Sequence, residues 1–123
     1  MNDHDVVGSW RELLARHATT WCVLERELGE KHGLGVSDFE VLDRMAESEH
    51  GKYRVQELAD EVHLSQSALS RLVSRLEKAG LVCRNMCQED RRGVFVQITE
   101  AGIDRHRQAL PTHRAVLGAS LND

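Results

Sequence analysis

A change of hydrophobic period within residues 55–99 constrains the fold of this chain more than any other feature. Apolar residues first recur at the spacing of two short helices: Val55, Leu58, Ala59, Val62, Leu69, Leu72, Val73 and Leu76. Farther along, Val94, Val96 and Ile98 alternate with Phe95 and Gln97 at the two-residue period of a strand. Two short helices followed by a β-hairpin form a winged helix-turn-helix. We therefore expect a mainly α fold with a small β-hairpin wing.

The segments before this unit also have helical patterns. A seam of apolar and aromatic residues predicts a helix from about Val6 to His32, ended by Gly33: Trp10, Leu14, His17, Trp21, Leu24 and Leu28. A capping box of Ser37 and Glu40, flanked by Val36 and Val41 as a hydrophobic staple, predicts the start of the next helix. Its expected buried face consists of Phe39, Leu42, Met45 and Ala46.

Turn and capping residues set the remaining boundaries. His63 and Leu64 form the expected turn, Ser65 is the expected N-cap of the next helix, and Gly80 closes that helix. Strands are expected over Leu81–Met86 and Val94–Ile98, with a short one over Tyr53–Val55. Thr99 is expected to cap a further helix, which Pro111 should break or kink before a last helix in Thr112–Asp123.

The charge is unevenly distributed along the chain. The whole chain carries a formal net charge of −4, and residues 25–61 hold 11 Asp or Glu against 5 Lys or Arg. Residues 62–92 hold 6 Lys or Arg against 3 Asp or Glu, a net +3. Since local field decides where a polyanion binds, this segment is the candidate for nucleic-acid contact.

A helix that reads the major groove needs a polar outer face on a packed inner face. The helix expected after Ser65 has such a face: Gln66, Ser67, Ser70, Arg71, Ser74, Arg75 and Lys78. Gln66 and Arg71 can form bidentate bonds to bases, and Arg75 and Lys78 suit phosphates. Ser65 and Ser67 lie at the helix N-terminus, which favours a phosphate. At the hairpin tip, Arg91 and Arg92 can enter a minor groove, with Asp90 orienting an arginine.

Three motifs resemble the MarR family of bacterial transcription regulators: LSQSALSRLVSRLEKAGLV, the wing motif EDRRG and the closing QITEAG. The resemblance spans roughly residues 36–110. It implies a winged helix-turn-helix homodimer that binds a pseudo-palindromic operator, most often as a repressor relieved by a small ligand or an oxidant. It also implies that Ser67, Ser70 and Arg71 face bases, that Arg75 and Arg84 meet the DNA backbone, and that Arg92 is the wing arginine oriented by Asp90.

The resemblance also implies how the chain is organised. Residues 1–35 would be an N-terminal dimerisation helix, 36–99 the DNA-binding lobe, and 100–123 the C-terminal dimerisation helices, all within a single domain. Family members usually continue into a longer last helix, whereas this chain stops at Asp123. Either the dimer interface is trimmed here or the sequence is a truncated form.

The residues that would respond to an effector are expected on the first helix. Trp10, His17 and Trp21 either pack in a core or dimer interface or line a pocket for an aromatic or phenolic ligand. Arg11 or Arg16 would pair with a carboxylate of that ligand. Cys22 gives a second hypothesis, sensing of an oxidant by a thiol, although a buried inert cysteine is commoner.

Other function classes find less support in the sequence. It has no Gly-rich phosphate loop, GxSxG, HExxH or CxxC motif, so we expect no enzyme, no metal and no cofactor. A winged helix that binds protein remains an alternative, against which the basic outer face argues. The acidic N-terminus is unlike a signal peptide, and no apolar run has membrane-spanning length. These observations predict a cytoplasmic bacterial protein, associated with the nucleoid when bound to DNA.

Overall fold

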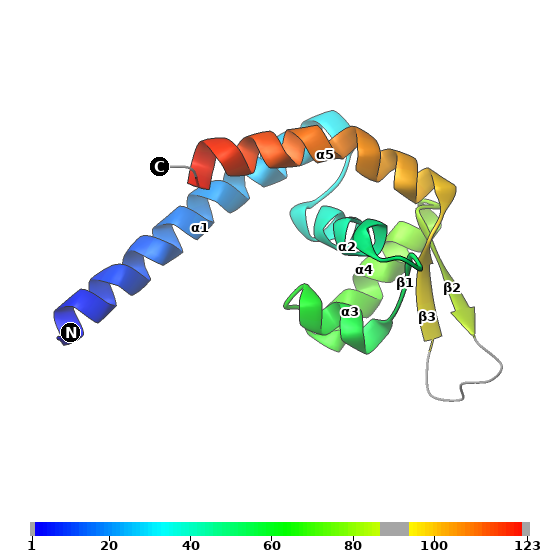
Figure 1. Ribbon diagram of the computed structural model, residues 1–123, viewed down its shortest axis with the longest axis horizontal. Helices are drawn as coiled ribbons and strands as arrows, with labels where there is room; N and C mark the ends of the chain where they lie inside the picture. Colours follow the sequence, from blue (N-terminus) through cyan, green and yellow to red (C-terminus); the bar gives the residue numbers. More distant parts are fainter. Residues whose placement is uncertain (1, 87–93, 122–123) are drawn as a thin grey trace. The chain divides into compact units, whose positions relative to one another are not determined.

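The chain is mainly helical, with one small antiparallel sheet (Figure 1). A computed structural model describes residues 2–86 and 94–121. The elements in chain order are α1 (Asp3–His32), α2 (Val36–Glu47), β1 (Lys52–Arg54), α3 (Val55–Glu61), α4 (Gln66–Lys78), β2 (Val82–Met86), β3 (Val94–Ile98) and α5 (Glu100–Leu121). The predicted fold class, a helical protein with a small β wing, is confirmed.

The chain divides into two compact units. The first comprises Met1–Val36 and Ala109–Asp123, and the second comprises Ser37–Gln108. The second unit therefore holds the whole sheet together with α3, α4 and the first part of α5. Among the described residues, none of the helices combines the length and the apolar character that crossing a membrane requires.

The second unit has a continuous apolar core. Its fully buried side chains come from helices and sheet alike: Phe39, Val41, Leu42, Met45, Leu58, Leu69, Val73, Val82 and Val96. Burial of this surface is the main favourable contribution to the stability of the unit. The expectation that Ala46 belongs to the buried face of α2 is wrong. Ala46 is exposed because it lies in the last turn of α2, beside the exposed Glu47.

The N-terminus of α2 differs from its prediction. The helix begins at Val36, so Ser37 lies within its first turn and is not the N-cap. The backbone N–H of Val36 donates to Glu25 Oε1 of α1 at 2.8 Å. A carboxylate distant in sequence thus satisfies a donor at the start of the helix, where local capping had been expected.

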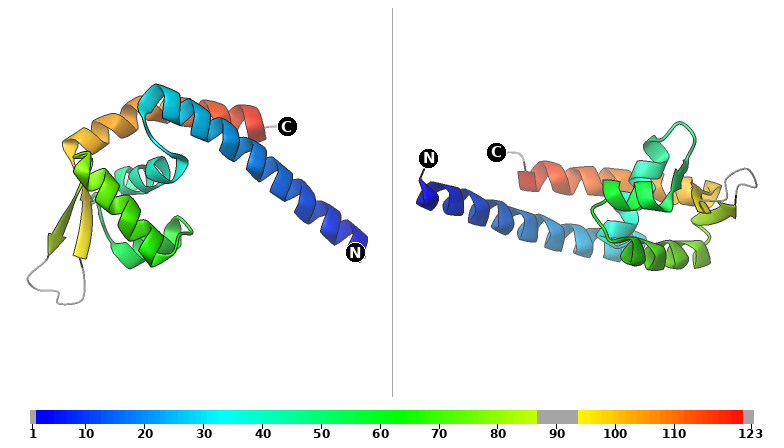
Figure 2. Two further views of the ribbon diagram at one scale, coloured as in Figure 1. Left: turned by 180° about the vertical axis from the view of Figure 1, so that it is seen from behind. Right: turned by 90° about the horizontal axis from the view of Figure 1, so that it is seen from below.

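The three strands pair in the order β1-β3-β2, and both pairs are antiparallel. Val96 of β3 lies opposite Tyr53 of β1 and Arg84 of β2, and its side chain is fully buried. Since side chains alternate along a strand, these three residues point to the helix-covered face of the sheet. The helix α4 leads directly into β2 and lies beside it (Figures 1 and 2). The paired strands β2 and β3 are called the wing hairpin below.

Hydrogen bonds of Thr99 join the start of α5 to the residues that follow α4. The Thr99 hydroxyl accepts from the backbone N–H of Gly102 at 3.1 Å, which confirms Thr99 as the predicted cap. The same hydroxyl donates to the carbonyl of Gly80 at 2.6 Å. A Cβ on Gly102 would overlap the carbonyl oxygen of Leu81, so this turn of α5 approaches the backbone as closely as glycine permits.

The predicted break at Pro111 is wrong, because α5 runs unbroken from Glu100 to Leu121 with Pro111 inside it. Proline removes one helical hydrogen bond, and packing within the first unit offsets that loss. Two side chains that follow Pro111, His113 and Val116, are buried. Thr112 Oγ1 lies 2.9 Å from His32 Nε2 at the end of α1.

The seam predicted on α1 has two different environments. Leu24 and Leu28 are buried in the first unit, whereas Trp10, Leu14 and Trp21 are exposed. Together with their neighbours these residues form an exposed apolar stripe, defined here as Val6, Val7, Trp10, Leu13, Leu14 and Trp21. Exposure of so many large apolar side chains along one helix is unusual for a surface that meets only water.

Candidate nucleic-acid interface

The turn between α3 and α4 sets the start of the polar helix. His63 adopts a left-handed backbone with φ of 60°, and the N–H of Leu64 donates to the carbonyl of Ala59 at 3.0 Å. Ser65 is the N-cap of α4, as predicted, and its Oγ accepts from the N–H of Ala68 at 3.1 Å. Ser67 Oγ lies 3.3 Å from Ser65 Oγ, so both hydroxyls gather at the helix N-terminus.

The two faces of α4 separate as the sequence predicts. Leu69, Leu72, Val73 and Leu76 are buried, which fixes the helix against the core of the second unit. Most of the predicted nucleic-acid contacts are exposed: Ser65, Gln66, Ser67, Arg71, Arg75 and Lys78. Ser70 and Ser74 are half-buried and lie at the border of the two faces. The helix therefore presents amide, hydroxyl and cationic groups from a firmly packed scaffold.

Arg75 has a partner that the sequence did not reveal. Its Nη2 lies 3.0 Å from Oδ1 of Asp38, in the first turn of α2. The Arg75 side chain is still 63% exposed, whereas that of Asp38 is largely covered. The pair joins α2 to the outer face of α4, and it leaves the guanidinium within reach of an incoming phosphate.

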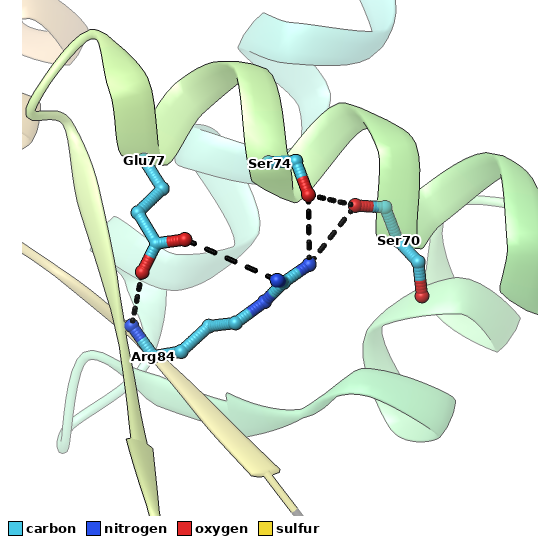
Figure 3. Close-up of polar contacts among 4 residues, drawn as sticks. All are labelled: Ser70, Ser74, Glu77 and Arg84. Atoms are coloured by element: carbon cyan, nitrogen blue, oxygen red, sulfur yellow. Dashed lines mark hydrogen bonds and ion pairs between the residues drawn. The ribbon is translucent and has the colours of Figure 1, made fainter.

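Arg84 of β2 contacts α4 through three residues, as Figure 3 shows. Its Nη2 donates to the carbonyl of Ser70 at 3.0 Å and to Ser74 Oγ at 3.1 Å. Its backbone N–H donates to Glu77 Oε2 at 3.3 Å. This guanidinium, expected at the DNA backbone, is engaged within the protein. The alternation of β2 was the available clue, because Arg84 shares a face with the buried Val82.

The comparisons with known proteins agree on one family. A family model described as MarR family matches residues 37–94, which include α3, the turn, α4 and β2 and end at the first residue of β3. The solved structure of AbsC, a MarR family transcriptional regulator from Streptomyces coelicolor, is 34% identical. It superposes with a TM-score of 0.87 over 98% of this chain and 80% of that one. The chain belongs to the MarR family.

Two further relatives of this MarR family chain extend the comparison. Sco3205, a MarR family regulator from Streptomyces coelicolor solved in complex with DNA, is 29% identical with a TM-score of 0.90, over 98% of this chain and 76% of that one. The HTH-type transcriptional regulator MhqR of Bacillus subtilis is 34% identical over 69% of this chain. The chain spans 57% of the length of MhqR. These relatives are transcriptional regulators and not enzymes, as the sequence predicted.

The predicted wing-tip contacts of the MarR family chain are Asp90, Arg91 and Arg92, and all three lie outside the described residues. The other face of the sheet carries two cations on β1, beside the wing hairpin. Lys52 Nζ and Arg54 Cζ of β1 lie 5.3 Å and 5.2 Å from the centroid of the Phe95 ring. These cation–π contacts order two basic side chains at the sheet edge formed by β1.

The candidate effector residues of the MarR family chain lie on α1 in the first unit. Trp10, Arg11, His17 and Trp21 are exposed, and the rings of His17 and Trp21 are 5.6 Å apart between centroids. Cys22 is also exposed. Within residues 2–86 and 94–121, no three or more His, Cys, Asp or Glu side chains are grouped so that they could hold a metal ion.

Sequence reasoning missed a polar pair in the MarR family chain, between the buried Asp43 and the part-buried His106. His106 of α5 lies with its Nε2 2.7 Å from Asp43 Oδ1 of α2, and its ring stacks on Phe39 at 5.4 Å between centroids. On the sheet side, Tyr53 of β1 has a pKa raised above 10.0, chiefly by burial and then by the charge of Glu61, to which it hydrogen-bonds. Both groups tie secondary-structure elements together within the second unit.

Proposed function

We propose that the chain binds double-stranded operator DNA as a transcription regulator. In this proposal α4 enters the major groove and the wing hairpin approaches the adjacent minor groove. The observation that carries it is the outer face of α4, where exposed Gln66, Ser67 and Arg71 project from a helix whose other face is buried. The DNA complex of Sco3205, a relative with the same fold, supports this reading.

The roles along α4 follow from reach and chemistry. Arg71 and Gln66 can each make two hydrogen bonds to a purine edge, and the short side chains of Ser67 and Ser70 permit close approach. Arg75 and Lys78, near the helix C-terminus, are assigned to phosphates. The N-terminus of α4 offers the hydroxyls of Ser65 and Ser67 and the backbone N–H groups of its first turn to a further phosphate. Arg91 and Arg92, oriented by Asp90, are assigned to the minor groove.

We further propose that the working form is a homodimer. The exposed apolar stripe of α1 supports a second copy as its occupant, because Trp10 and Leu13 are 56% and 61% exposed in the single chain. Two copies related by a two-fold axis would present two α4 helices to the half-sites of a pseudo-palindromic operator.

The regulatory step that we propose is repression relieved by a small aromatic or phenolic ligand. Where the second copy leaves them uncovered, Trp10 and Trp21, with His17 beside Trp21, are the side chains available for aromatic stacking, and Arg11 supplies a cation for a carboxylate. Because the chain contains only two tryptophans and both lie on α1, their fluorescence reports ligand binding directly. Quenching by a phenolic acid that also dissociates the DNA complex is the expected result. A ligand that quenches without releasing DNA would argue against relief of repression.

The experiment that tests DNA binding is selection of bound duplexes from random DNA, followed by a salt titration of the selected site. We expect a two-fold symmetric consensus and an affinity that falls steeply as ionic strength rises. Recovery of unselected sequences with no shared half-site would contradict the proposal. A protein-binding module would show no salt-dependent affinity for any duplex.

A further inference from the structure

We propose that Arg84 is a positioning residue that braces the wing hairpin against α4, and that it does not contact the DNA backbone. The contact lies within the protein, so only its consequence for DNA affinity rests on the proposed function. The proposal replaces the phosphate contact that the family resemblance implies for Arg84.

The placement of Arg84 in the sheet points it toward α4. It pairs with Val96 of β3, whose side chain is fully buried on the helix-covered face. Val82, two residues earlier on the same strand, is buried as well. Since alternate residues of a strand share a face, Arg84 extends the row of these core side chains toward the end of the hairpin. On this face of the sheet, Arg84 thus takes the place next to the apolar side chains of Val82 and Val96.

The donors of Arg84 are matched to acceptors along α4. Nη2 is shared between the carbonyl of Ser70 and the hydroxyl of Ser74, at 3.0 Å and 3.1 Å. The Ser74 hydroxyl in turn donates to the carbonyl of Ser70 at 3.0 Å. Nη1 lies 3.9 Å from Glu77 Oε1, so a carboxylate offsets the charge. Figure 3 shows the guanidinium lying between the strand and the helix, directed at all three residues.

This geometry contrasts with that of Arg71 on the same helix. Both residues are exposed, but the Arg84 guanidinium donates to Ser70 and Ser74 and its backbone N–H donates to Glu77. An arginine held through its backbone and its guanidinium by one helix is pre-organised for that helix. If the Arg84 guanidinium turned instead to a DNA phosphate, its hydrogen bonds to Ser70 and Ser74, which hold β2 to α4, would break.

The brace has a consequence for reading DNA. It fixes the spacing between the residues of α4 that face bases and the hairpin that reaches the neighbouring minor groove. A fixed spacing reduces the ordering cost when both elements bind at once. Loss of the brace should therefore weaken binding without removing a phosphate contact, and it should let the hairpin open more often in the free protein.

The experiment compares Arg84→Gln with Arg71→Gln, which removes the same charge from an exposed position. Hydrogen exchange of the β2 and β3 amides is measured in the free protein, and the salt dependence of duplex binding is measured for both variants. We expect Arg84→Gln to accelerate that exchange by roughly tenfold and to leave the slope of log K against log salt unchanged. Arg71→Gln should leave the exchange unchanged.

Two outcomes would overturn the proposal. One is unaltered exchange in Arg84→Gln, and the other is a salt slope reduced by about 0.9 per subunit, which marks a lost phosphate contact. Ser74→Ala provides a second test should Arg84→Gln fold poorly, because it removes an acceptor and leaves every charge in place. It should also accelerate exchange in the hairpin. If the wild-type chain bound no duplex, the proposed function would be wrong. The hydrogen exchange of the free protein would still test whether Arg84 holds the wing hairpin against α4.

Discussion

His106 of α5 and Asp43 of α2 form a hydrogen bond of 2.7 Å in which the two side chains are only 11% and 6% exposed. The stack of the same imidazole on Phe39 adds an aromatic contact to this polar one. A histidine held on two sides in this way is a structural link between α2 and the first part of α5, both in the second unit.

Replacing Asp43 with alanine should therefore destabilise the protein. The change leaves the part-buried imidazole of His106 without this acceptor, which costs about 1–3 kcal/mol. Urea denaturation gives the free energy of unfolding. Asp104→Ala is the matched control, because Asp104 bonds Arg107 at the surface of the same helix. That exposed pair should contribute less than about 1 kcal/mol. Equal losses in the two variants would argue against a structural role for the buried pair.

Gly102→Ala should destabilise the start of α5. The added methyl group would overlap the carbonyl oxygen of Leu81 and crowd Ile98, which costs about 1–3 kcal/mol through overpacking. Gly118→Ala, in the same helix, meets nothing within 4 Å and should stabilise the protein by about 0.5–1 kcal/mol. Thermal unfolding of both variants checks the opposite signs. A stabilising Gly102→Ala would show that this turn has room to move.

Tyr53 should make stability depend on alkaline pH. Burial, and then Glu61, raise the pKa of its phenol above 10.0 in the folded protein. As pH rises through about 10, the unfolded chain loses this proton first, so the free energy of unfolding falls until the folded phenol also ionises. Urea titrations between about pH 8 and 11 measure the slope. Tyr53→Phe should show a shallower decline, and an identical slope in both proteins would exclude Tyr53 as its source.

Arg71→Ala should weaken operator binding and relax its sequence preference. Loss of a bidentate contact to a base costs about 1–3 kcal/mol, and the cost depends on the base. Fluorescence anisotropy with the selected duplex and with single-base variants measures both effects. Lys78→Ala is the control, because loss of a phosphate contact weakens binding to all sequences alike. An equal loss of affinity for all duplexes in Arg71→Ala would indicate that Arg71 contacts a phosphate and not a base.

Leu13→Asp should disrupt the homodimer. It places a charge in the exposed apolar stripe of α1, and burying an unpaired carboxylate in an interface is strongly unfavourable. Sedimentation velocity should show a shift from dimer to monomer, with a loss of affinity for the two-fold site. Thr19→Asp puts the same charge on the opposite side of the helix and should leave the dimer intact. Dimers of unchanged stability in Leu13→Asp would place the interface elsewhere.

Local sequence signals predicted the parts of the fold that are decided locally. The Ser65 cap, the buried stripe of Leu69 to Leu76 and the Thr99 cap depend on residues within a few positions, and the structure has them as expected. The MarR resemblance rested on the same segment, and it is confirmed by the family match over 37–94.

The errors came from contacts between residues distant in sequence. Glu25 of α1 accepts from the N–H of Val36, and α2 begins there, one residue before the Ser37 that the local pattern predicts as the cap. Packing of His113 and Val116 carries α5 past Pro111, which a local rule treats as a helix breaker. The partner of Arg75 depends on which elements meet in the second unit, and neither composition nor periodicity contains that information. For Arg84, the alternation of β2 indicated the face of the sheet but not the partners on α4.

The hydroxyl of Thr99 has a mechanical consequence. One oxygen atom joins the carbonyl that follows α4 to the first turn of α5, and glycine at position 102 allows the two backbones to touch. Moving the first turn of α5 away from the end of α4 would therefore have to break these hydrogen bonds and open the close approach at Gly102.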